Sequence, residues 1–149
     1  MSRRAEIAMA GDEVAAFIAS RQVMTCATQG RDGWPHLMPL WFVVRDGECW
    51  AWTYAKSQKV RNLERDPRCT LQFEAGEAYN ELRGVMLKCD CVIHRELETV
   101  SALGEEIARR YGGADLDDAA RAYVARQAAK RVAMQFQPRE TASWDHRKL

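Results

Sequence analysis

The sequence lacks an excess of charge of either sign. It carries 22 Lys and Arg against 21 Asp and Glu, which gives a formal net charge of +1. A domain whose main role is to coat nucleic acid is usually strongly basic. The charge balance therefore argues against that class of protein.

Long hydrophobic runs and an export signal are also lacking. No stretch reaches the roughly 18 apolar residues of a membrane-spanning helix, so we expect no membrane partner. The first residues, Met-Ser-Arg-Arg, are followed by acidic residues before any apolar segment, which does not fit a signal peptide. We expect a cytoplasmic protein, and 149 residues of ordinary globular composition predict a single domain over residues 1–149.

Cysteine pairs with the spacing of a metal or redox motif are absent. The five cysteines are odd in number, and none shows the Cys-x-x-Cys spacing of zinc ribbons. Cys89 and Cys91 are two residues apart in an alternating strand pattern, which suits core packing better than a metal site. We expect buried free thiols and no bound metal.

The spacing of the apolar residues predicts four helices and six strands. Helices are expected over residues 12–20 (capped by Asp12), 57–65, 97–111 and 115–130. Strands are expected over residues 23–28, 35–44, 48–54, 69–75, 82–95 and 131–137, with Asp46-Gly47 closing a hairpin and Pro138 starting an irregular tail. This order predicts an α+β fold: a small six-stranded antiparallel barrel with flanking helices.

The strand over residues 35–44 is apolar on both faces. Leu37, Trp41 and Val43 alternate with Met38 and Phe42. A strand with two apolar faces is normally covered on both. A small barrel covers only the inner face, so either a second copy of the chain or one of the chain's own helices covers the other. A homodimer is the expectation, because symmetric dimers are the commonest oligomers. The same apolar faces disfavour a nucleic-acid-binding barrel.

A cluster of basic residues marks the start of the helix over residues 57–65. Lys56, Ser57 and Lys59 follow directly on the strand that ends at Tyr54. A helix N-terminus presents free N–H groups and partial positive charge, so this cluster predicts an anion site, most simply for a phosphate. The alternative is that Ser57 only caps the helix and the basic residues are solvated.

Four segments together resemble the pyridoxamine 5′-phosphate oxidase-like superfamily of flavin-binding split-barrel proteins. They are Asp32-Gly-Trp-Pro-His36, Met38-Pro-Leu-Trp-Phe42, Trp52-Thr-Tyr-Ala-Lys-Ser-Gln-Lys59 and Arg61-Asn-Leu-Glu-Arg-Asp-Pro-Arg68. Within this superfamily the chain is most similar to the branch that uses the deazaflavin F420 or FMN. The resemblance implies a homodimeric six-stranded split β-barrel with a cofactor in each of two grooves between the subunits.

The resemblance also implies cofactor-binding roles for particular residues. Lys59 matches the lysine that binds the cofactor phosphate, with Ser57 and Lys56 beside it. The other positions implied or suggested as cofactor contacts are Thr53, Met38, Pro39, Leu40, Trp41, Trp52 and Arg61. From the tail, Trp144 and Arg147 either fold over the partner's cofactor or seal the dimer.

The chain differs from true pyridoxamine phosphate oxidases at residues with which those enzymes bind FMN. Those enzymes carry an Arg and a Lys on the second strand, where Met38 and Val43 stand here, and an Arg-Lys pair where Gln58-Lys59 stands. Vitamin B6 oxidation is therefore not expected. The reading is an F420-dependent oxidoreductase that transfers hydride to a small unsaturated or electron-poor substrate.

Two other readings remain open. They are an FMN-binding oxidoreductase and a flavin- or haem-handling binding protein with little turnover. The catalytic residues are unknown, since His36, His94 and His146 are isolated in the sequence and each is more often structural.

Overall fold

The computed structural model describes residues 2–113 and 115–149. The helical elements are α1 (Arg3–Glu6), α2 (Gly11–Ser20), α3 (Gln58–Arg65), α4 (Leu97–Gly112), α5 (Asp118–Ala128) and the short 3₁₀ turns η1 (Tyr79–Glu81) and η2 (His146–Lys148). The strands are β1 (Met24–Gln29), β2 (Pro35–Leu40), β3 (Val43–Arg45), β4 (Glu48–Tyr54), β5 (Arg68–Ala75), β6 (Arg83–His94) and β7 (Arg131–Asp145).

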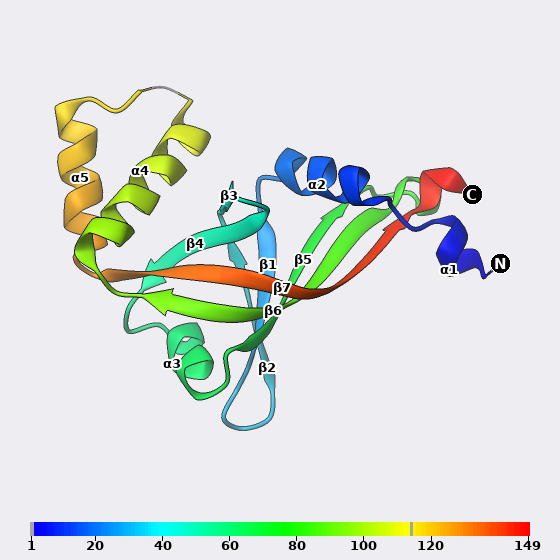
Figure 1. Ribbon diagram of the computed structural model, residues 1–149, viewed down its shortest axis with the longest axis horizontal. Coiled ribbons are helices and arrows are strands. Elements are labelled where there is room, and N and C mark those ends of the chain that lie inside the picture. The colour runs from blue at the N-terminus through cyan, green and yellow to red at the C-terminus, as the bar shows by residue number, and fades with distance from the viewer. Residues whose placement is uncertain (1, 114) are drawn as a thin grey trace.

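The strands form one curled antiparallel sheet, as Figure 1 shows, in the order β2-β1-β5-β6-β7-β4-β3. The α+β class is therefore confirmed. The count of six strands is wrong, because the sheet has seven. The expected strand over residues 35–44 is divided at Trp41 and Phe42 into β2 and β3, which are the two opposite edges of the sheet.

The division between β2 and β3 has a local cause. The backbone N–H of Phe42 donates to the Tyr111 hydroxyl at 3.0 Å, and its carbonyl accepts from the Arg110 guanidinium, so α4 replaces a neighbouring strand there. The same Tyr111 hydroxyl lies 2.8 Å from the carbonyl of Gln22, ahead of β1. Helix α4 thus holds the point at which the chain passes from one sheet edge to the other.

Two helix starts differ from the sequence expectation. Asp12 does not cap α2: Ala10 occupies the N-cap position, and its N–H donates to the Glu13 carboxylate at 2.6 Å. Helix α5 begins at Asp118 and not at residue 115, because the Asp117 side chain accepts from the N–H of Ala120 and caps the helix there.

The expected irregular tail is wrong. Strand β7 continues through Pro138 to Asp145 and pairs with β6 along nearly its whole length. The register shifts opposite Lys88 and Cys89, so that Arg139 is an extra, bulged residue beside Pro138. A bulge accommodates a proline that has no N–H for the ladder.

The sheet encloses one core on its inner face and supports a second beneath α4. The inner core includes Phe42, Phe73 and Phe136, and all five cysteines are buried in it. The prediction of buried free thiols is confirmed. The second core contains Val100, Leu103, Ile107 and Val43, with Trp50 and Trp52 packed against it.

The chain's own helices cover β3 and β4 but leave β2 largely uncovered. On and beside β2, the side chains of Leu37, Met38 and Trp41 are 56%, 41% and 55% exposed. A second copy that covers this apolar edge stays a prediction. No helix of the described residues is long and apolar enough to cross a membrane.

Candidate functional site

Helix α3 lies beneath the sheet at the end away from the two termini (Figure 1). It forms because Val60 and Leu63 are buried on one face, and it ends where Asp66-Pro67 forces an extended backbone. The strand β4 leads directly into its first turn. The end of β4 and the start of α3 therefore bring Thr53, Ser57 and Lys59 together.

Lys59 is a buried ammonium group without a carboxylate partner. Its Nζ donates to the Thr53 hydroxyl at 2.9 Å, and the two residues are 7% and 5% exposed. None of the ion pairs among the described residues includes Lys59. Burial lowers the pKa of the Lys59 ammonium below its usual value, and the positive charge of Arg131 acts in the same direction. Buried charges are normally paired, so this side chain is placed at a cost in stability.

Ser57 adds a buried hydroxyl with nothing to bind. It stands at the N-cap position of α3, but its side chain makes no capping hydrogen bond, and its Oγ is buried without a partner in the protein. The reading in which Ser57 merely caps the helix is therefore wrong. An uncapped helix start, an orphaned hydroxyl and a cation with no counter-ion fit an anionic group such as a phosphate.

Other polar contacts fix α3 to β1. The Asn62 side chain is fully buried, donates to the Thr28 hydroxyl at 3.0 Å and accepts from Gln58 at 2.9 Å. Arg65 reaches over to the carbonyl of Gln29 at 2.7 Å. Sequence reasoning missed Asn62, although its position three residues after Lys59 places it on the same buried helix face.

The basic residues around α3 do not all lie together. Lys56 is exposed just before the helix. Arg61 is exposed on α3, where it lines a separate hollow with Trp34 of the β1–β2 connection and His36 of β2. Arg61 is therefore positioned away from the buried contact between Lys59 and Thr53.

The four residues expected along the cofactor ring follow the free edge of the sheet. Met38, Pro39 and Leu40 belong to β2, which pairs only with β1, so half of its backbone groups have no strand partner. Trp41 follows them and stacks on Tyr111 of α4, with ring centroids 4.2 Å apart and an interplanar angle of 5°. One face of the Trp41 ring is therefore already covered.

Trp52 lies on the opposite face of β4 from Thr53. Its ring packs so closely on Gly104 of α4 that a side chain there would overlap it. The Arg131 guanidinium lies over the Trp52 ring at 4.7 Å and over Tyr54 at 4.1 Å. Trp52 is a contact between sheet and helix in this chain.

Trp144 and Arg147 lie at the far end of the molecule from α3, near the termini (Figure 1). The Trp144 ring packs on Gly84 of β6, and Arg147 forms a two-point ion pair with Asp145, the shorter contact being 2.7 Å. Within one chain neither residue reaches the start of α3. A role at a cofactor requires the site of a second chain.

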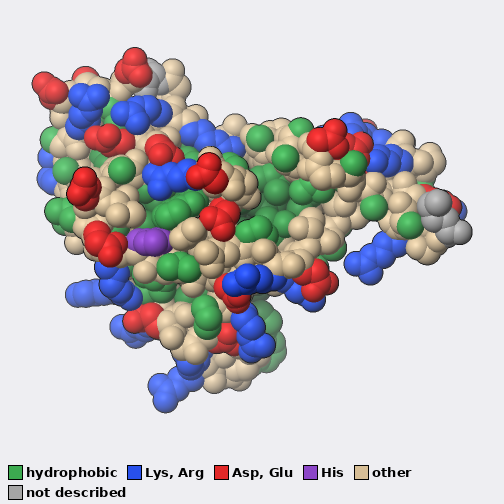
Figure 2. Space-filling view, viewed as in Figure 1, with side chains coloured by type: hydrophobic (Ala, Val, Ile, Leu, Met, Phe, Trp, Pro, Cys, Tyr) green, Lys and Arg blue, Asp and Glu red, His purple; other side chains and the backbone are tan. Residues whose placement is uncertain are grey.

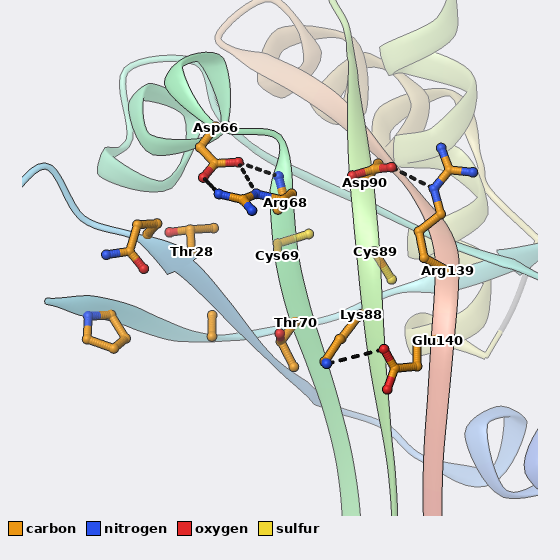
Figure 3. Close-up of a pocket in the computed structure, with 13 residues that line it drawn as sticks. Thr28, Asp66, Arg68, Cys69, Thr70, Lys88, Cys89, Asp90, Arg139 and Glu140 are labelled. Atoms are coloured by element: carbon orange, nitrogen blue, oxygen red, sulfur yellow. Dashed lines mark hydrogen bonds and ion pairs between the residues drawn. The ribbon is translucent and has the colours of Figure 1, made fainter. Parts of the chain in front are cut away.

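A second groove of about 570 Å³ runs across β1, β5, β6 and β7. Figure 3 shows three ion pairs around it: Asp66 with Arg68, Asp90 with Arg139, and Lys88 with Glu140. Each cation has its own carboxylate, so the groove offers no uncompensated charge. Sequence reasoning missed this groove because it placed residues 138–149 in an irregular tail.

Two of the buried cysteines are poor candidates for a nucleophile. Burial raises the pKa of the Cys49 and Cys89 thiols to about 12, so both stay protonated at neutral pH. His94 stacks on Trp50 and shares a 2.9 Å hydrogen bond with Gln135, and His146 contacts the carbonyl of Tyr79 at 2.8 Å. Neither histidine lies at the start of α3.

Comparison with known proteins identifies the fold's relatives. The family described as Pyridoxamine 5′-phosphate oxidase matches residues 10–145. The crystal structure of the conserved hypothetical protein Rv2991 from Mycobacterium tuberculosis is 42% identical, with a TM-score of 0.90 over 99% of this chain and 92% of that chain. None of the curated proteins matches the chain.

More distant structures share the fold and differ in what they bind. A protein named F420 Reductase is 18% identical, with a TM-score of 0.68 over 90% of this chain and 98% of that one. HutZ, the haem storage protein from Vibrio cholerae, is 16% identical, with a TM-score of 0.69 over 89% of this chain and 94% of that one. At this identity the likeness shows the fold alone, so the choice of cofactor rests on the residues of the site.

Proposed function

The chain belongs to the pyridoxamine 5′-phosphate oxidase family, and from that premise we propose that it is an oxidoreductase that binds the deazaflavin F420. Its substrate would be a small unsaturated or electron-poor molecule. The observation that carries the proposal is the start of α3, where a buried cation without a counter-ion and a buried hydroxyl without a partner lie at a helix N-terminus.

The residues at the start of α3 fit the phosphate of such a cofactor. The Ser57 hydroxyl and the uncapped N–H groups of α3 would donate to phosphate oxygens, and the exposed Lys56 ammonium would add charge. Lys59 would supply a second ammonium group, in exchange for its contact with Thr53. The bound cofactor would supply the hydride transfer.

The remaining roles concern the ring system. The free backbone edge of β2 would run along the ring at Met38, Pro39 and Leu40. Trp41, which is held in place by its stacking on Tyr111, would form one side of the ring-binding groove. The absence of Arg and Lys at Met38 and Val43 favours F420 over FMN, and it argues against oxidation of pyridoxamine phosphate. FMN is the second candidate, since the phosphate anchor itself does not distinguish the two cofactors.

We also propose that the protein works as a homodimer. The exposed apolar side chains of Leu37, Met38 and Trp41 form a surface of the kind that dimers bury. Trp144 and Arg147 of one chain would then approach the cofactor of the other. A monomer at micromolar concentration in sedimentation velocity, with and without cofactor, would contradict this arrangement.

Cofactor titration tests the proposal directly. The purified full chain is titrated with F420 and with FMN, and binding is followed by cofactor fluorescence. We expect F420 to bind more tightly than FMN. Loss of one hydrogen bond from a charged donor is worth about 1.5–3 kcal/mol, so Lys59→Ala should weaken F420 binding by about ten- to a hundredfold.

Lys130→Ala is the matched control. Lys130 is an exposed lysine whose backbone carbonyl accepts from Ala55 and whose backbone N–H donates to Gln127, so removal of its side chain should leave the affinity unchanged. If the wild-type chain binds neither cofactor at micromolar concentration, the proposed function fails. If FMN binds more tightly than F420, the protein is instead the FMN-binding oxidoreductase of the second candidate.

A further inference from the structure

A hollow of about 580 Å³ lies between α3 and the β1–β2 connection with the first residues of β2. We call it the arginine pocket, because Arg31, Arg61 and Arg65 all line it. In Figure 2, several Lys and Arg side chains lie over this lower part of the molecule, with Asp and Glu side chains between them. The pocket is distinct from the buried contact of Lys59, which faces the inside of the sheet.

The positive charge in the lining of the arginine pocket exceeds the negative charge there. Across residues 2–113 and 115–149, the side chains of Arg31 and Arg61 take part in no ion pair or hydrogen bond with the protein. Arg65 binds a backbone carbonyl and not a carboxylate. The single acid in the lining, Asp32, accepts from the N–H of Trp34 at 3.0 Å. Three guanidinium groups thus face one carboxylate that is already engaged.

A histidine in the same lining has an unused polar atom. His36 is directly opposite Thr28 in the antiparallel pair of β1 and β2, so both side chains point to the face that α3 covers. The Nδ1 atom of His36 is buried and has no hydrogen-bond partner in the protein. A buried polar atom without a partner is rare in folded proteins and indicates that the partner is a ligand or water.

The wall of the pocket is fixed before any ligand binds. The N–H of Gly30 donates to the carbonyl of Trp34, and that of Gly33 to the carbonyl of Gly30, both at 3.0 Å. Gly33 has a φ of 86°, which glycine adopts without strain, and Gly30 leaves no room for a side chain beside the Trp34 carbonyl. A preformed wall lowers the entropy cost of binding.

We propose that the arginine pocket is a binding site for a small multivalent anion of the carboxylate or phosphate class. Guanidinium groups bind such oxygens through paired, charge-assisted hydrogen bonds, and His36 would add a second kind of contact. The pocket has the volume of a small-molecule site, and the chain as a whole is nearly neutral, which disfavours a nucleic acid. The anion is either part of the cofactor or a separate ligand.

Calorimetric titration of the full chain with inorganic pyrophosphate and with a tri-glutamate peptide tests this site. At low ionic strength the wild type should bind at least one probe, and added salt should weaken the binding. Removal of two charged donors in Arg31→Gln/Arg61→Gln should weaken it by about a hundredfold or more. His36→Phe, which keeps a ring and removes Nδ1, should weaken it by about tenfold.

Arg126→Gln is the control, because Arg126 is an exposed arginine on α5, away from the pocket. All three pocket arginines are exposed, so the variants should fold, which a thermal melt checks. The proposal is overturned if the wild type binds neither probe at millimolar concentration. It is also overturned if the double variant binds as tightly as Arg126→Gln.

Competition then separates the two sources of the anion. If the bound probe is displaced by F420 but not by a deazaflavin that lacks the phosphate and acidic tail, the pocket holds the anionic part of the cofactor. If F420 binds without displacing the probe, the pocket holds a separate anionic ligand. Either result supports an anion site, and its existence does not depend on whether F420 is the cofactor.

Discussion

The buried ammonium of Lys59 should destabilise the protein when no anion is bound. Replacing it with a side chain of similar length and no charge, and replacing its partner with an isostere, gives the double variant Lys59→Met/Thr53→Val. Both positions are nearly inaccessible, at 7% and 5% exposure, so the new side chains stay out of water. We expect the double variant to be more stable than the wild type.

The magnitude follows from two opposing terms. Burial of an unpaired ion costs several kcal/mol after relaxation, whereas the hydrogen bond to Thr53 returns about 1.5–3 kcal/mol. Substituting buried ionic groups with apolar ones is often stabilising by about 1–4 kcal/mol. For a domain near this size, each kcal/mol raises the melting temperature by about 2–4 °C. Lys59→Met alone should gain less, because it leaves the Thr53 hydroxyl without a partner.

The pH dependence provides a second measure. Burial lowers the pKa of Lys59 in the folded state below its value in the unfolded chain. The unfolded state therefore binds more protons between the two pKa values, and the free energy of unfolding gains a contribution that rises with pH across that window. The double variant should lose this contribution.

Urea denaturation of the wild type, the single variants and the double variant across that pH range measures both effects. Lys130→Met, at an exposed lysine, is the control and should change neither stability nor its pH dependence. A double variant less stable than the wild type, with an unchanged pH profile, would refute the idea that Lys59 is held in place for a ligand. The same substitution should weaken cofactor binding, so stability and function would change in opposite directions.

Three further outcomes are expected. Tyr111→Phe should lower the free energy of unfolding by about 1–3 kcal/mol in urea denaturation, because the N–H of Phe42 loses its acceptor; no loss would mean that water replaces the hydroxyl. Gly84→Ala should lower the melting temperature, because the new Cβ overlaps the Trp144 ring, and an unchanged melt would show that the indole moves freely. A thiol reagent should react with the native protein at pH 8 far more slowly than with the denatured chain, because burial raises the pKa of Cys49 to about 12; equal rates would contradict a closed core.

The elements that were predicted correctly are those in which the preferences of neighbouring residues favour the same structure as the packing of the fold. The Asp46-Gly47 hairpin is present, with φ of 51° and 78° at the two residues, as the turn type requires. Helix α3 is present because a breaker, Asp66-Pro67, follows its amphipathic segment. In each case a few neighbouring residues were sufficient to specify the structure.

The predictions that failed depend on residues distant in the sequence. The break between β2 and β3 is made by Arg110 and Tyr111, almost seventy positions after Phe42. The continuation of β7 beyond Pro138 requires a bulge opposite Cys89 of β6. No local pattern contains either partner.

The candidate site was predicted in part for the same reason. The closeness of Ser57 and Lys59 follows from their neighbouring positions, and the contact with Thr53 from a short turn. That Trp52 faces Gly104, and that Arg61 faces the β1–β2 connection, depends on how the sheet and α3 pack. The sequence could not show that the Nδ1 atom of His36 lacks a hydrogen-bond partner, because only the structure shows which polar groups remain without partners.

The hydrogen bonds from α4 to the backbone of Phe42 have a consequence for synthesis on the ribosome. The chain crosses from one sheet edge to the other at Phe42, and the residues that hold that crossing emerge only with Arg110 and Tyr111. Strand β7, which pairs with β4, is synthesised later still. We therefore expect the nascent chain to carry an unclosed, partly apolar sheet until β7 has emerged, and until then chaperones and a second nascent copy have access to strand edges that the finished fold covers.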